Sequence, residues 1–86
     1  MKTIKFTQYL LPDGRTKEVF IDVEDEIGEK AEKFIEDGGK FEIEMLTTGD
    51  ISMTAVWRDE DISIEVVKNG PEVISAVDNL IKSIKI

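Results

Sequence analysis

Residues 1–23 alternate between apolar and polar side chains with the period of two that is typical of a β-strand. We expect a first strand over residues 2–11 and a returning strand over residues 16–23. The segment between them, Pro12-Asp13-Gly14-Arg15, has turn composition, because proline presets φ and glycine accepts a positive φ. The two strands therefore form a β-hairpin.

The register of this hairpin follows from matching the apolar positions of its two strands. The pairing that brings Phe6 opposite Ile21 puts apolar residues together on one face. The same pairing places Lys5 opposite Asp22 on the other face, where their charges attract. We therefore expect this register.

Residues 24–37 change to the 3.6-residue spacing of an amphipathic helix. One apolar stripe is formed by Ile27, Ala31, Phe34 and Ile35. Acidic residues crowd the first turn, where the positive end of the helix dipole stabilises negative charge. Gly38-Gly39 can adopt the left-handed conformation that ends many helices, so we expect the helix to stop there.

Three further alternating segments follow, and their apolar positions agree with one another. They cover residues 40–46, 51–57 and 62–67. A three-residue loop that ends in a left-handed Gly49 would pair Met45 with Ile51. A turn after Trp57 would pair Trp57 with Ile62. This register puts the isoleucines of the last strand on the shared apolar face.

The chain ends with a second amphipathic helix. Asn69-Gly70-Pro71-Glu72 supplies a capping residue, a proline for the first turn and an acid. A broad apolar face follows, made of Val73, Ile74, Val77, Leu80, Ile81 and Ile84. The element order is thus ββαβββα. We expect a single α+β domain over residues 1–86, with a five-stranded antiparallel sheet and both helices packed on one face.

Composition narrows the possible chemistry and location. The 86 residues include 19 acidic and 11 basic residues, which gives a net charge of −8, and neither cysteine nor histidine occurs. Disulfide frameworks, thiol chemistry, Cys/His zinc sites and histidine bases are therefore excluded. No run approaches the ~18 apolar residues that span a bilayer, and the start of the chain lacks the apolar core of a secretion signal. We expect an acidic, cytoplasmic protein without membrane contact.

The sheet face that the helices leave open is mostly polar, with three exceptions on the first hairpin. Tyr9, Leu11 and Phe20 are large apolar side chains expected on that face. Such residues either take part in ordinary cross-strand packing or form a contact patch. We take them as the candidate interaction face of a non-enzymatic protein-interaction module. The expected partner is another protein or a second copy in a homodimer, with no cofactor and no direct nucleic-acid binding.

A second interpretation starts from the acidity of the chain. Eight of the 19 acidic residues lie within residues 22–37, and Glu29, Glu32 and Glu36 share the polar face of the expected helix 24–37. Most such faces are the solvated side of an amphipathic helix. The functional alternative is a DNA-mimicking inhibitor of the phage type, whose acidic surface occupies a basic groove on another protein.

A third interpretation places chemistry on the open face. Glu42, Glu44 and Glu65 are expected there, and neighbouring carboxylates can hold a divalent cation or act as acid and base. Acid–base catalysis also needs an apolar pocket that gives the two carboxyl groups different pKa values, and the sequence implies no such pocket. A minimal enzyme or divalent-metal binder is therefore the alternative that we favour least, and we expect no catalytic residues.

Five stretches carry a resemblance to known proteins: Phe6-Thr7-Gln8-Tyr9, Pro12-Asp13-Gly14-Arg15, Gly39-Lys40-Phe41-Glu42-Ile43-Glu44, Leu46-Thr47-Thr48-Gly49 and Asn69-Gly70-Pro71-Glu72-Val73. They resemble small uncharacterised bacterial and phage proteins, which implies a shared fold and assigns no activity. The order αβββα of residues 24–86 is similar to that of the double-stranded-RNA-binding domain. The basic cluster of that family falls at residues 69–73 here, which include no lysine or arginine, so RNA binding is not expected.

Overall fold

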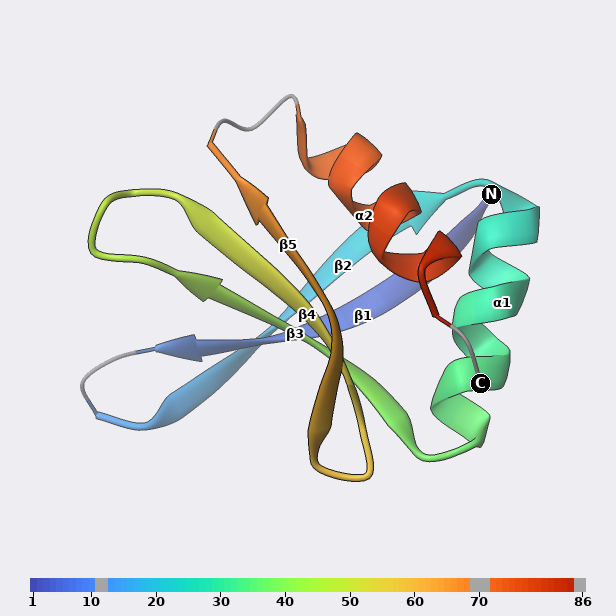
Figure 1. The fold of residues 1–86 in the computed structure, drawn as a ribbon, viewed down its shortest axis with the longest axis horizontal. Coiled ribbons are helices and arrows are strands. Elements are labelled where there is room, and N and C mark those ends of the chain that lie inside the picture. Colours follow the sequence, from blue (N-terminus) through green and yellow to red (C-terminus); the bar gives the residue numbers. More distant parts are fainter. Residues whose placement is uncertain (11–12, 69–71, 85–86) are drawn as a thin grey trace.

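The computed structural model describes residues 1–10, 13–68 and 72–84. In this part of the chain, seven elements follow the expected order ββαβββα (Figure 1). They are β1 (Lys2–Leu10), β2 (Arg15–Val23), α1 (Asp25–Glu36), β3 (Gly39–Met45), β4 (Ile51–Trp57), β5 (Glu60–Val67) and α2 (Val73–Lys82). The expected helix start at residues 69–71 lies outside the described residues. No helix in the described ranges is long and apolar enough to cross a bilayer.

The strands form one sheet in the order β2-β1-β3-β4-β5. The sequence predicts a wholly antiparallel sheet, and this prediction is wrong, because β1 and β3 run parallel. In Figure 1, α1 crosses the end of the sheet at which β1 begins. The chain therefore re-enters the sheet from that end and places β3 alongside β1. The sheet is mixed, with β2 and β5 at its edges.

The register of the first hairpin differs from the predicted one by two residues. Phe6 lies opposite Val19 instead of Ile21, and Lys5 lies opposite Phe20 instead of an acidic residue. A shift of two residues keeps every side chain on its own face of the sheet. The alternating pattern is therefore compatible with both registers, and only the turn geometry distinguishes them.

The loop between β3 and β4 is as predicted. Gly49 has a φ of 90°, in the left-handed region. The Leu46 N–H donates a hydrogen bond to the Asp50 carbonyl at 2.8 Å, which closes a three-residue loop. Met45 consequently lies opposite Ile51.

The turn between β4 and β5 is shorter than predicted. Arg58 and Asp59 have φ angles of 52° and 65°, so they form a two-residue loop, and Trp57 lies opposite Glu60 instead of Ile62. A β-bulge next to this turn shifts the pairing again. The rest of β5 is displaced by one residue from the predicted register, which moves its side chains to the opposite faces.

This displacement exchanges the two faces of β5. Val67, predicted on the open face, is buried in the core. Ile64 and Val66, predicted in the core, lie opposite Thr54 and Ser52 on the open face and are 57% and 54% exposed. The edge strand β5 therefore presents apolar side chains to solvent.

Both helices pack on the same face of the sheet, as predicted. α1 lies over β1 and β3, and α2 lies over β4 and β5 (Figure 1). Phe41 stands at the centre of the core, with its ring centroid 5.3 Å from that of Phe6 and 5.2 Å from that of Phe34. Trp57 is partly buried against this core and donates its indole N–H to the Asp37 carbonyl at 2.9 Å. The core thus joins α1 to β1, β3 and β4.

The helix α1 approaches β1 closely at Gly28. A Cβ atom on Gly28 would lie 2.5 Å from the Cβ of Lys2, a distance at which one of the two backbones must move. Because the Cβ is the fixed first atom of the lysine side chain, rotation of that side chain cannot relieve the contact. Residue 28 therefore has to be glycine for α1 to lie where it does.

Gly28→Ala should destabilise the fold although alanine is the better helix former. Overpacking costs about 1–3 kcal/mol, which outweighs a gain of about 1 kcal/mol in helix propensity. Urea unfolding followed by Trp57 fluorescence measures the net change. Lys33→Ala, at an exposed position of the same helix, is the matched control and should stay within about 0.5 kcal/mol of the parent. A Gly28→Ala protein more stable than the parent would contradict the close approach.

Candidate functional site

The first hairpin carries the residues predicted to form an interaction face. Tyr9 and Phe20 both lie on the open face of the sheet, as predicted. The polar pair of Thr7 and Glu18 lies between them, so they do not form one continuous apolar patch. Leu11 lies outside the described residues. The structure therefore places two of the three residues on the open face of the sheet and separates them along the hairpin.

Tyr9 is tied to the centre of the sheet. Its hydroxyl donates a hydrogen bond to Oε2 of Glu42 on β3 at 2.7 Å. This hydrogen bond favours the neutral phenol and raises the pKa of Tyr9 above its ordinary value. The ring is 40% exposed. Tyr9 is thus a partly solvated side chain that links two parallel strands.

Phe20 lies on the edge strand β2 and is 62% exposed. Its neighbours Val19 and Ile21 point to the helix face, where they are only partly buried against the core. Neither helix packs on β2 as it does on the inner strands. The middle of β2 is therefore apolar on both faces, exposed on the open face and only partly covered on the helix face.

Charged side chains occupy the middle of the open face. They are Lys5, Glu18, Lys40, Glu42 and Glu44. Lys5 and Glu18 approach each other diagonally, with Nζ 3.8 Å from Oε1. The most exposed large apolar side chains on this face lie on the edge strands, Phe20 on β2 and Ile64 and Val66 on β5, whereas Tyr9 on β1 is only 40% exposed and its hydroxyl is bonded to Glu42. An apolar contact therefore has to use an edge of the sheet and not its centre.

The exposure of Ile64 and Val66 on β5 is not predicted by the sequence pattern. Alternation along Ile62, Ile64 and Val66 predicts burial of all three, and the bulge reverses it for Ile64 and Val66, whereas Ile62 still packs against the core. Arg58 and Asp59 both have a positive φ, which is uncommon for residues other than glycine. The sequence of this turn therefore does not indicate a two-residue loop. The local sequence therefore does not predict the bulge or the exposed side chains that it produces.

The carboxylates of the third interpretation are not brought together. Glu42 and Glu44 lie on the open face, whereas Glu65 lies opposite Met53 on the helix face, beside Ala76 of α2. The expectation of three carboxylates on one face is therefore wrong, because the β-bulge that exchanges the faces of β5 also moves Glu65. Within the described residues, no three His, Cys, Asp or Glu side chains are arranged to hold a metal ion.

The acidic residues of α1 form an exposed stripe, as predicted. Glu29, Glu32 and Glu36 follow one another at helical spacing, and Asp25 continues the row toward the start of the helix. We call these four residues the acidic stripe. Lys2 on β1 reaches into it, with Nζ 3.2 Å from Glu32 Oε1, and this contact raises the pKa of Lys2. The stripe is therefore partly neutralised by its own chain.

The acidic stripe lies on the outward surface of α1, opposite its buried residues, and one side of that surface is nearer to β2. Lys2 and Gly28 mark that side, because they are in contact and Lys2 lies opposite Val23 of β2. The other side of α1 faces α2, where the Lys30 ammonium donates a hydrogen bond to the Lys82 carbonyl at 3.4 Å. The acidic stripe lies between these two sides, and Glu32 reaches the β2 side through its contact with Lys2.

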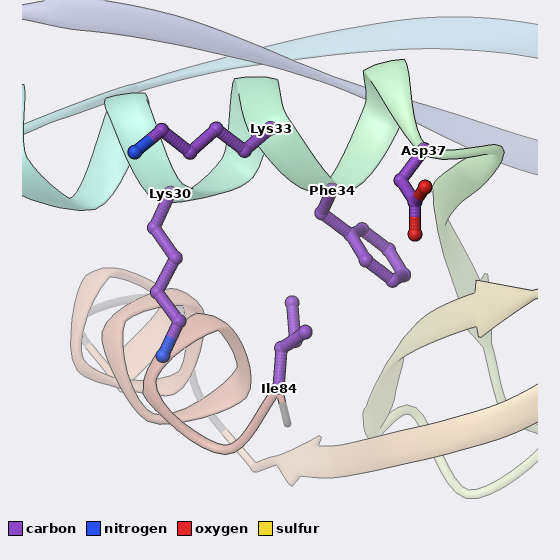
Figure 2. A pocket seen from close by; sticks show the side chains of 5 residues that line it. All are labelled: Lys30, Lys33, Phe34, Asp37 and Ile84. Atoms are coloured by element: carbon purple, nitrogen blue, oxygen red, sulfur yellow. The ribbon is translucent and has the colours of Figure 1, made fainter. Parts of the chain in front are cut away.

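A shallow hollow of about 350 Å³ lies between α1 and the end of α2 (Figure 2). Phe34 and Ile84 form its apolar floor, and Lys30, Lys33 and Asp37 stand around it. In Figure 2 the two lysine amines point away from the floor, Lys30 toward the end of α2 and Lys33 along α1. The polar groups do not converge on a common point, so the hollow lacks the arrangement that fixes a small ligand.

Comparison of the chain with family models, curated proteins and solved structures gave no match. The resemblance to bacterial and phage proteins and the cytoplasmic location therefore stay predictions from the sequence. The features that bear on function are therefore those of the surface described above.

Tyr9 should ionise at a higher pH than an ordinary tyrosine. Because it is the single tyrosine of the chain, the ultraviolet absorbance of the tyrosinate reports its pKa directly. We expect a midpoint above 10.0 in the parent and a lower one in Glu42→Gln, which removes the negative charge. The stability that this contact contributes is present below pH 10 and is lost as the pH rises through the raised pKa. Equal midpoints in both proteins would contradict the contact.

Proposed function

We propose that this protein is a non-enzymatic protein-interaction module that binds its partner through the first hairpin, with Phe20 at the centre of the contact. The observation that carries this proposal is the exposure of an aromatic ring, 62% exposed, on an edge strand. Large apolar side chains exposed at one place are a common feature of interaction sites.

The edge position of β2 supports the proposal in a second way. An edge strand pairs on one side only, so its outward backbone N–H and C=O groups are open to another strand. Partners that bind by strand addition use these groups for affinity and alternate side chains for specificity. On β2 the alternate side chains are Val19 and Ile21 on one face and Phe20 on the other.

The alternative of a DNA-mimicking inhibitor has weaker support. A mimic presents a long row of negative charge to its partner, and the acidic stripe has only four carboxylates, two of which lie close to cations of the same chain: Asp25 lies 3.0 Å from the amino terminus, and Glu32 is paired with Lys2. The alternative of a minimal enzyme or metal binder loses its basis when Glu65 is on the other face of the sheet. The hairpin surface therefore explains more of the structure than either alternative.

A photo-cross-linking amino acid placed at position 20 tests this function. We expect p-benzoylphenylalanine at position 20 to form protein adducts on illumination in the native lysate, because the side chain lies in the contact. The same amino acid at position 64 is the matched control, since Ile64 is as exposed but lies on the opposite edge. Mass spectrometry identifies the adducts.

Adducts at position 20 that clearly exceed those at position 64 support the hairpin surface. Equal or absent adducts at position 20, in a protein whose circular dichroism matches the parent, would refute it. Adducts at position 64 alone would move the contact to β5.

A further inference from the structure

We infer that the occupant of the β2 edge is a second copy of this chain, paired antiparallel with β2 about a two-fold axis at Val19. This inference rests on the proposed function and adds the identity of the partner and the register. Such pairing would join the two sheets into one continuous sheet. It would also bring together the apolar residues in the middle of each β2, Val19, Phe20 and Ile21.

The charges along β2 are complementary under this symmetry. The strand begins with Arg15 and Lys17, carries Asp22 just before its last residue, Val23, and is followed by Glu24 and Asp25. An antiparallel second copy sets the basic start of each strand against the acidic end of the other. A strand of uniform charge would repel its own copy, whereas this one attracts it at both ends.

The register follows from the same charges. Keeping both helix layers on one side of the joined sheet requires that residues of the same face lie opposite each other. Centring on Phe20 would place Glu18 opposite Asp22, and centring on Glu18 would place it opposite itself. Centring on Val19 avoids both repulsions, because Glu18 then lies opposite Phe20 and Asp22 opposite Thr16.

This register also brings a basic segment to the acidic stripe. Arg15 and Lys17 lie on the helix face of the hairpin, beyond the helices, because they share that face with Val19 and Val23. In the pair, the second copy's Arg15 lies opposite Val23, and its Lys17 lies opposite Ile21. Lys2 flanks Val23 from the other side and already reaches the stripe.

Adjacent strands are about 4.8 Å apart, so the second copy's Arg15 lies one strand spacing outside Val23, and its Lys17 lies two residues further along the same strand. Both side chains are long and lie on the helix face, from which they extend toward the acidic stripe. In the single chain, Arg15 is paired with Asp13 at 2.7 Å, but both groups are exposed, and such a pair is easily exchanged. The acidic stripe is thereby explained as the site for the basic end of the second copy.

The other edge of the sheet does not offer this fit. Pairing β5 with its own copy so that Ile64 meets Val66 would place Glu65 opposite Glu65. The start of β5 carries Glu60 and Asp61 beside a bulge, and a bulged, acidic edge discourages strand addition. The bulge and the acidic start of β5 therefore favour β2 over β5 as the edge that pairs with a second copy.

A single introduced cysteine tests the pairing and its register, because the chain has no cysteine of its own. Val19→Cys places the two thiols directly across the axis, at a separation that a disulfide can span with a small adjustment. We expect Val19→Cys to form a disulfide-linked dimer at least about tenfold faster than Ser63→Cys, a partly buried position on β5. Sedimentation equilibrium of the parent chain should also show a mass that rises from monomer to dimer with concentration.

The outcomes separate this inference from the proposed function. Slow, equal cross-linking of both cysteine variants, together with a parent chain that stays monomeric at all concentrations tested, would overturn the second copy as occupant. Adducts of position 20 with a different protein would leave the proposed function standing in that case. If position 20 also forms no adducts, both proposals fail.

Discussion

The packing of Phe41 between Phe6 and Phe34 joins the first hairpin, β1 and β2, to the other three strands of the sheet. The backbone contributes little at that junction, because the parallel pairing of β1 with β3 covers only two residue pairs. The aromatic contacts, at 5.3 Å and 5.2 Å between centroids, supply what the short ladder does not. Gly39 makes room for them, since a Cβ there would lie 2.5 Å from the ring of Phe34.

The position of this core determines which surface is left for function. Because α1 packs over β1 and β3, and α2 over β4 and β5, the helix layer ends before β2. The strand keeps an apolar centre with Phe20 exposed and a charge gradient from Arg15 to Asp22. The same helix carries the acidic stripe, which Lys2 of the neighbouring strand contacts at Glu32, so we treat the exposed strand and the acidic surface as one proposed contact and not as two unrelated features.

Elements set by local patterns could be predicted, and pairings set by geometry could not. The bounds of α1 and the loop ending at Gly49 follow from periodicity and a single glycine. The register of the first hairpin could not be found from a pattern of period two, and the parallel pairing of β1 with β3 depends on where α1 crosses. At the candidate site, Tyr9 and Phe20 were placed on the correct face, whereas the bulge in β5 moved Glu65 away from Glu42 and Glu44.

A charge exchange between two variants tests the proposed contact most directly. One variant carries Arg15→Glu and Lys17→Glu, the other Glu29→Lys and Glu32→Lys, and sedimentation measures each alone and in an equal mixture. We expect each alone to dimerise at least about tenfold more weakly than the parent, because like charges then meet at both ends of the pair. The mixture should regain a dimer, since both ends of the mixed pair are again complementary. A mixture that stays as monomeric as its components would contradict the account.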